Sequence, residues 1–119
     1  MEAAGLGLFM LSACVFGTLL GHPGSPLALV AASPLLMRAL MGMAMGLTAL
    51  ALVLSPWGKR SGAHFNPAVT LTFLRLGKIA PWDAGFYVAA QFVGCVGGVA
   101  LARVLLGDAL AHPAVRYVA

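Results

Sequence analysis

The side chain best suited to a functional role in this sequence is the amide of Asn66, within Ser61-Gly62-Ala63-His64-Phe65-Asn66-Pro67-Ala68-Val69-Thr70. An asparagine oxygen can accept an unpaired backbone N–H at a helix start, and its NH₂ group can donate to a water or hydroxyl oxygen. Pro67 suits the first helical position, because its missing N–H would have no partner there. The pattern predicts a helix that begins at Pro67 with an amide donor at its N-terminus.

This predicted helix is too short to cross a membrane. The apolar run from Ala68 to Leu76 has about ten residues, or roughly 15 Å, and a bilayer core is about 30 Å thick. Unwound backbone at membrane depth is tolerated only where it is buried in protein or lines a cavity. We therefore expect a re-entrant loop and half-helix over about residues 59–78. The backbone before Asn66 is expected to expose a row of carbonyl acceptors, those of Gly62, Ala63, His64 and Phe65.

The composition indicates a membrane protein. Of the 119 residues, 61% are hydrophobic and 8% are charged, which leaves too much apolar surface for a soluble domain of this size. The net charge of +4 includes no basic cluster with interleaved aromatics, so the cations are expected to face lipid headgroups and not nucleic acid. Cys14 and Cys95 lie inside apolar runs, as buried thiols do. The scattered histidines offer neither metal spacing nor a nucleophile–base pair, so no enzyme, metal site or cofactor is expected.

Three apolar runs are long enough to span the bilayer, over about residues 3–20, 37–54 and 82–106. Residues 27–36 are expected to form an apolar loop or a short interfacial turn. Glycines at positions i, i+3 and i+4 of the third run predict one face for close helix contact, formed by Gly94, Gly97 and Gly98. Together these features predict an all-α membrane fold with three transmembrane helices and one re-entrant half-helix, forming a single unit over residues 1–119.

The distribution of cations predicts the orientation. Four of them cluster where the second span ends, at Lys59, Arg60, Arg75 and Lys78. The opposite side has only Arg38, Arg103 and Arg116. By the positive-inside rule, the N-terminus is cytoplasmic and the re-entrant segment enters from the cytoplasm. We expect a multi-pass protein of the plasma or inner cell membrane.

The stretch around Asn66-Pro67-Ala68 resembles the first Asn-Pro-Ala signature of the aquaporin and glycerol-facilitator family. Other parts of the chain are similar to the family's three helices, namely Glu2 with Phe16-Gly17-Thr18, then Ala44 to Thr48, then Tyr87 with Ala90-Gln91 and Gly94. Family members have two inverted halves whose Asn-Pro-Ala caps meet near the midplane, and they form tetramers. This chain resembles the first half only, because His112-Pro113-Ala114 is not followed by an apolar half-helix. The resemblance implies a second half as partner, from a continuation of the chain or from another copy, and a homotetramer of complete channels.

The resemblance also implies roles for individual residues. Glu2 corresponds to a first-helix glutamate that binds loop N–H groups, although a solvated N-terminal acid is the alternative. Gln91 is expected to hydrogen-bond the re-entrant loop or, otherwise, to form a polar helix–helix contact. His64 is either a pore-lining gate near the cytoplasmic mouth or a structural hydrogen-bonding group. The second-span residue of the selectivity constriction is Met45 by motif, or Gly46 by spacing, where strict water channels have an aromatic ring.

The expected function is passive passage of water and small neutral solutes, with protons and ions excluded at the half-helix N-terminus. The alternative is a non-conducting membrane unit that serves only in oligomerisation, because one half cannot close a pore alone. The identity of the solute, the gating and the oligomeric state do not follow from the sequence.

Overall fold

The structure is a computed structural model that describes residues 1–30 and 33–115, so Arg116 lies outside the described residues. The described residues form five α-helices and two short 3₁₀ turns: α1 (Glu2–Gly21), α2 (Pro34–Leu54), α3 (Pro56–Ser61), α4 (Pro67–Arg75), α5 (Pro81–Leu106), η1 (Gly107–Ala109) and η2 (Pro113–Val115). In the described part of the chain, three helices, α1, α2 and α5, are long and apolar enough to cross a membrane. The predicted all-α membrane architecture is confirmed.

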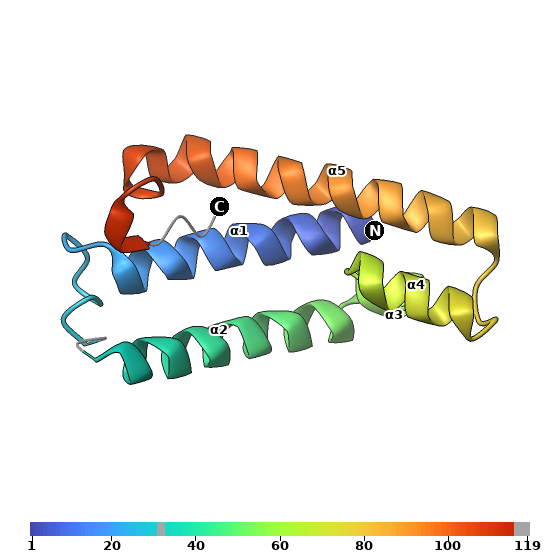
Figure 1. The fold of residues 1–119 in the computed structure, drawn as a ribbon, viewed down its shortest axis with the longest axis horizontal. Coiled ribbons are helices and arrows are strands. Elements are labelled where there is room, and N and C mark those ends of the chain that lie inside the picture. The colour runs from blue at the N-terminus through green and yellow to red at the C-terminus, as the bar shows by residue number, and fades with distance from the viewer. Residues whose placement is uncertain (31–32, 116–119) are drawn as a thin grey trace.

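Helices α1 and α5 run side by side in the same direction and make the most extensive contact in the fold (Figure 1). Their backbones approach closely at glycines. A Cβ on Gly94 would collide with the Ala3 carbonyl, and one on Gly98 would collide with the Gly7 carbonyl. Gly97 faces open space, so the expected face of three glycines is formed only by Gly94 and Gly98, one helical turn apart.

Helix α2 lies antiparallel to α1 and is attached to it by a polar contact. The hydroxyls of Ser12 and Thr48 are 2.8 Å apart, and the Thr48 hydroxyl also donates to the Ala44 carbonyl at 2.9 Å. None of the residues of α2 is fully buried, so one side of this helix is not covered by the other helices of the fold.

The expectation that residues 27–36 lie outside the helices is wrong for Pro34 to Leu36, because α2 begins at Pro34. Ser33 caps the helix by accepting the Leu36 N–H at 3.2 Å, and Pro34 occupies the first helical position. The Ser-Pro pair is therefore a helix start rather than a break in a loop.

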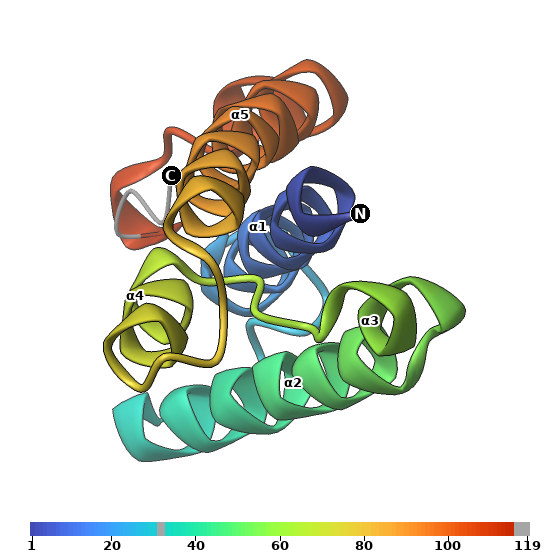
Figure 2. The same ribbon diagram turned by 90° about the vertical axis from the view of Figure 1, so that its right-hand side faces the viewer.

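A short helix, α3, connects α2 to the re-entrant loop and was not expected from the sequence. The Ser55 hydroxyl accepts the Gly58 N–H at 3.0 Å, which caps α3 directly after α2 ends. Gly58 packs against the last carbonyls of α2, where any side chain would collide with them. Gly62 ends α3 with a φ of 83°, and Figure 2 shows α3 and α4 on opposite sides of the loop that joins them.

Candidate pore-lining site

Asn66, an exposed residue, caps the N-terminus of the half-helix α4. The Asn66 Oδ1 atom accepts the Ala68 N–H at 2.8 Å, and Pro67 is the first helical residue. The nine residues of α4 span roughly 14 Å, about half of a bilayer core. Its N-terminus points toward the middle of the molecule, whereas its last turn lies at the end where α5 begins (Figures 1 and 2).

The backbone before Asn66 adopts a conformation that side chains rarely permit. Ala63 has a φ of 52° and Phe65 a φ of 43°, both in the left-handed region. Each such residue costs roughly 1–2 kcal/mol unless surrounding contacts hold it. Among the described residues, no hydrogen-bond donor reaches the carbonyl oxygens of Gly62 to Phe65. The predicted row of carbonyl acceptors is therefore unpaired within the described part of the chain, and its role at a pore stays a prediction.

Replacing Ala63 with glycine is expected to stabilise the protein by about 1 kcal/mol, because glycine adopts a positive φ without a Cβ clash. The measurement is reversible unfolding in mixed micelles, followed by circular dichroism. Ala68→Gly is the matched control, since Ala68 lies in the first turn of α4 and loses stability as a helical glycine. Equal destabilisation by both substitutions would contradict strain at Ala63.

Glu2 attaches the re-entrant loop to the long helices. Its side chain is 4% exposed, and its Oε2 atom accepts the Phe65 N–H at 2.7 Å and the Gln91 Nε2 at 2.7 Å. Its Oε1 atom is buried without a donor among the described residues, so the two hydrogen bonds to Oε2 make the whole attachment. A buried carboxylate requires such partners, because its desolvation is costly. Glu2 therefore lies among buried groups and joins α1, α5 and the loop.

Thr70 is a second connection, for which the sequence had suggested no role. Its side chain is fully buried, and its Oγ1 atom lies 3.0 Å from Gln91 Nε2, 3.1 Å from His64 Nδ1 and 3.3 Å from the Asn66 carbonyl. A sequence signal was present, because Thr70 follows Asn66 by four residues and therefore lies on the same face of the helix. Thr70 links the cap of α4 to Gln91 on α5.

His64 is enclosed by aromatic rings in addition to its contact with Thr70. It stacks on Phe73 with ring centroids 4.8 Å apart and meets Tyr87 edge-on at 5.2 Å. The Tyr87 hydroxyl donates to the Ser61 carbonyl at 2.9 Å, which holds the other end of the loop. His64 thus has the contacts of a structural group, and a gating role for it stays a prediction.

Comparison with known protein families identifies the chain. The family model of the major intrinsic proteins matches residues 7–118, which includes the loop, α4 and all but the start of α1. The chain belongs to the major intrinsic protein family. A search of solved structures returned no significant match.

Several relatives of this major intrinsic protein are named aquaporins or aquaglyceroporins. It is 48% identical over 48 residues to the aquaglyceroporin AqpS of Rhizobium meliloti, an alignment covering 40% of this chain and 21% of the relative. It is 41% identical over 78 residues to aquaporin-2 of Homo sapiens, covering 66% and 28% of the two chains. It is also 48% identical over 61 residues to aquaporin-2 of Erinaceus europaeus, covering 51% and 55%. The chain thus spans only part of the relatives that it matches.

The second-span position that the resemblance assigns to the constriction is not aromatic in this major intrinsic protein. Met45 is half-buried, and Gly46 is exposed, with open space where its side chain would be. An unbranched, flexible thioether fills space less rigidly than a ring. The assignment of Met45 or Gly46 to the constriction stays a prediction.

The cations of this major intrinsic protein lie at both ends of the molecule. Lys59 and Arg60 are exposed on α3, Arg75 ends α4, and Lys78 follows it in the turn. Arg38 lies near the start of α2, at the opposite end. Arg103, also at that end, pairs with Asp108 at 2.9 Å. Counting the described residues, the end that holds α3 and α4 has four cations and the other end has two.

Proposed function

We propose that this chain forms the first half of a channel wall that passes water and small neutral solutes and excludes ions and protons. One observation carries the proposal: the N-terminus of α4 points toward the middle of the molecule, and no donor among the described residues reaches the carbonyl oxygens of the four residues before Asn66. These groups give a narrow apolar passage a few hydrogen-bonding positions, which suits a small uncharged solute. Membership of the major intrinsic protein family and relatives named as aquaporins support the same reading.

The cap determines which group of Asn66 faces a solute. Because Oδ1 accepts the Ala68 N–H, the NH₂ group is left to donate to a passing oxygen. A water molecule at this point would accept from Asn66 and donate to a carbonyl of the preceding backbone. The N-terminus of α4 also concentrates roughly half a positive elementary charge, which repels cations and protons. The proposed selectivity therefore combines a donor, an acceptor row and a positive helix end.

The pore requires a facing half. We propose that a continuation of the chain or another copy supplies a second half-helix, and that complete channels assemble as a homotetramer. The four cations at the α3 and α4 end favour a cytoplasmic N-terminus in the plasma or inner membrane. We further propose that Met45 or Gly46 contributes to the selectivity constriction. Neither residue is aromatic, whereas strict water channels have an aromatic ring at this position.

Asn66→Asp is expected to admit cations while the fold remains intact. Aspartate caps helices as well as asparagine does, so α4 is preserved. Its carboxylate opposes the positive helix end, and the flux of monovalent cations should rise roughly tenfold. Proteoliposomes with the chain and a second half-repeat would be measured for water by stopped-flow swelling and for cations by a fluorescent dye.

The wild-type pore should raise water permeability without a proton flux, and Lys78→Gln should change neither flux, because Lys78 is exposed beyond α4. If the wild-type complex gives no more permeability than empty vesicles, the channel function is rejected. If it conducts water but Asn66→Asp leaves cations excluded, the proposed selectivity at the α4 N-terminus is wrong.

The alternative function is a non-conducting unit whose helices serve only in oligomerisation. The observation that favours it is the open side of α2, on which none of the residues is fully buried. Crosslinking and detergent sizing of the 119-residue chain would distinguish the two functions. A stable assembly that stays impermeable when the second half is present would support the oligomerisation unit.

A further inference from the structure

Two His-Pro turns with the same internal hydrogen bond meet at the end of the molecule opposite α4. In His22-Pro23-Gly24, which follows α1, the His22 Nδ1 atom accepts the Gly24 N–H at 3.1 Å. In His112-Pro113-Ala114, which leads into η2, the His112 Nδ1 atom accepts the Ala114 N–H at 3.1 Å. The two imidazole rings contact each other edge-on, with centroids 4.8 Å apart and planes at 65°.

These hydrogen bonds determine where each ring has its proton. An Nδ1 atom that accepts a hydrogen bond has no proton, so a neutral ring has its proton on Nε2. That proton occupies the lone pair with which Nε2 would bind a metal ion. The described residues also contain no group of three metal-ligating side chains. The pair is therefore arranged as two neutral rings and not as a metal site.

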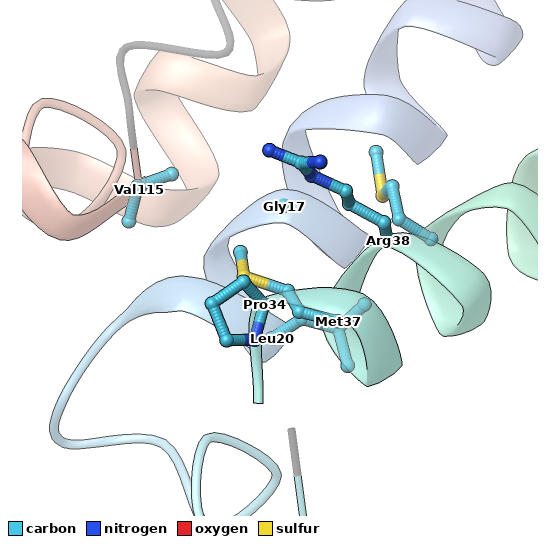
Figure 3. Close-up of a pocket in the computed structure, with 7 residues that line it drawn as sticks. Gly17, Leu20, Pro34, Met37, Arg38 and Val115 are labelled. Carbon is cyan, nitrogen blue, oxygen red and sulfur yellow. The ribbon is translucent and has the colours of Figure 1, made fainter. Parts of the chain in front are cut away.

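One histidine of the pair, His112, belongs to a segment that closes one side of a cavity. Residues 110–115 carry two buried side chains, Leu110 and Val115, and the backbone at Val115 packs directly on Gly21. A Cβ on Gly21 would lie 3.2 Å from the Val115 Cα. Val115 lines a cavity of about 250 Å³ together with Gly17, Leu20, Pro34, Met37, Arg38 and Met41 (Figure 3). Segment 110–115 thus forms a wall between α1 and the start of α2.

We propose that the contact between His22 and His112 is a pH-dependent latch, which holds segment 110–115 across this cavity while both rings are neutral and releases it on acidification. Protonation of either ring puts a hydrogen on Nδ1, where it meets the backbone N–H that it previously accepted. A second proton places two positive charges side by side. Histidine side chains change charge between about pH 5 and 8, so the latch is closed at the upper end of this range and open at the lower end.

Among the described residues, the charged groups at this end of the molecule are Arg38, Arg103 and Asp108. Arg38 on α2 lines the cavity that Val115 closes. Asp108 in η1 forms an ion pair with Arg103 on the protein surface. The last turn of α1 has no basic residue. The two histidines are thus the groups whose charge changes at this contact.

Hydrogen exchange of the 119-residue chain in nanodiscs tests the latch without any measurement of conduction. After correction for the intrinsic pH effect, amides of residues 110–115 should exchange roughly tenfold faster at pH 5 than at pH 8, since the Ala114 N–H loses its hydrogen bond and the segment its contact with His22. The amides of α1 and α5 should keep their protection. The double variant His22→Phe/His112→Phe should lose the pH dependence, whereas Asp108→Asn should retain it.

Nitrogen NMR of histidine-labelled wild-type chain provides a readout that needs no variant. At pH 8, His22 and His112 should both have the proton on Nε2. A proton on Nδ1 of either ring would overturn the proposal, as would corrected exchange of residues 110–115 that is equal at the two pH values. The proposal would also be overturned if the exchange of residues 110–115 still depended on pH in the folded double variant.

Discussion

Gly94→Val is expected to separate α1 from α5 and to destabilise the protein by about 3 kcal/mol. The valine Cβ would collide with the carbonyl of Ala3, and the backbone of a neighbouring helix cannot move aside as a side chain can. The α1–α5 contact is the most extensive in the fold, so losing this contact should lower the stability of the whole chain. The measurement is the unfolding free energy in mixed micelles, obtained from an SDS titration followed by circular dichroism.

Gly97→Val is the matched control, because Gly97 lies on the same helix and faces open space. The two substitutions change helix propensity by the same amount, so the difference between them isolates the packing contact. Gly97→Val should stay within about 0.5 kcal/mol of the wild type. Similar destabilisation by the two variants would show that α1 and α5 do not pack at Gly94.

This pair of glycines shows how far the sequence predicts the fold. Hydropathy and length predict the membrane class and the spans, because lipid requires long apolar helices. The i, i+3, i+4 glycines predict a close contact but not which glycine makes it. That choice depends on the position of α1, which lies about ninety residues away in the chain and leaves no local pattern.

The half-helix was the most predictable part of the site, since its signals are local. Asn66, Pro67 and a short apolar run lie next to one another in the sequence, and their cap geometry involves only neighbours. By contrast, α3 was missed, because it has only six residues and its signals are the cap Ser55 before Pro56 and the glycine Gly62 after its last residue. The contact between His22 and His112 was also missed. It joins turns separated by ninety residues, and each histidine alone resembles an ordinary loop residue.

The attachment of the loop through Glu2 was expected only from resemblance to a family, and it leads to the second large prediction. Glu2→Ala should destabilise the protein by about 3 kcal/mol, because it leaves the Phe65 N–H and one of the two hydrogens of the Gln91 amide buried without an acceptor. The left-handed conformation of Phe65 would then lose its backbone hydrogen bond to Glu2. Unfolding in mixed micelles measures the loss, and proteolysis at residues 59–65 reports whether the loop is released.

Two further variants separate charge from shape at this position. Glu2→Gln keeps one acceptor oxygen and should lose about half as much stability as Glu2→Ala, since hydrogen bonds to a charged group are about twice as strong as neutral ones. Asp108→Ala is the control for loss of a carboxylate, because Asp108 is 99% exposed and its ion pair contributes at most about 1 kcal/mol. If Glu2→Ala costs no more than Asp108→Ala, Glu2 does not hold the loop. If Glu2→Ala instead releases the loop while α1, α2 and α5 stay folded, the start of α4 is positioned mainly by a single carboxylate, and the proposed selectivity at Asn66 depends on Glu2.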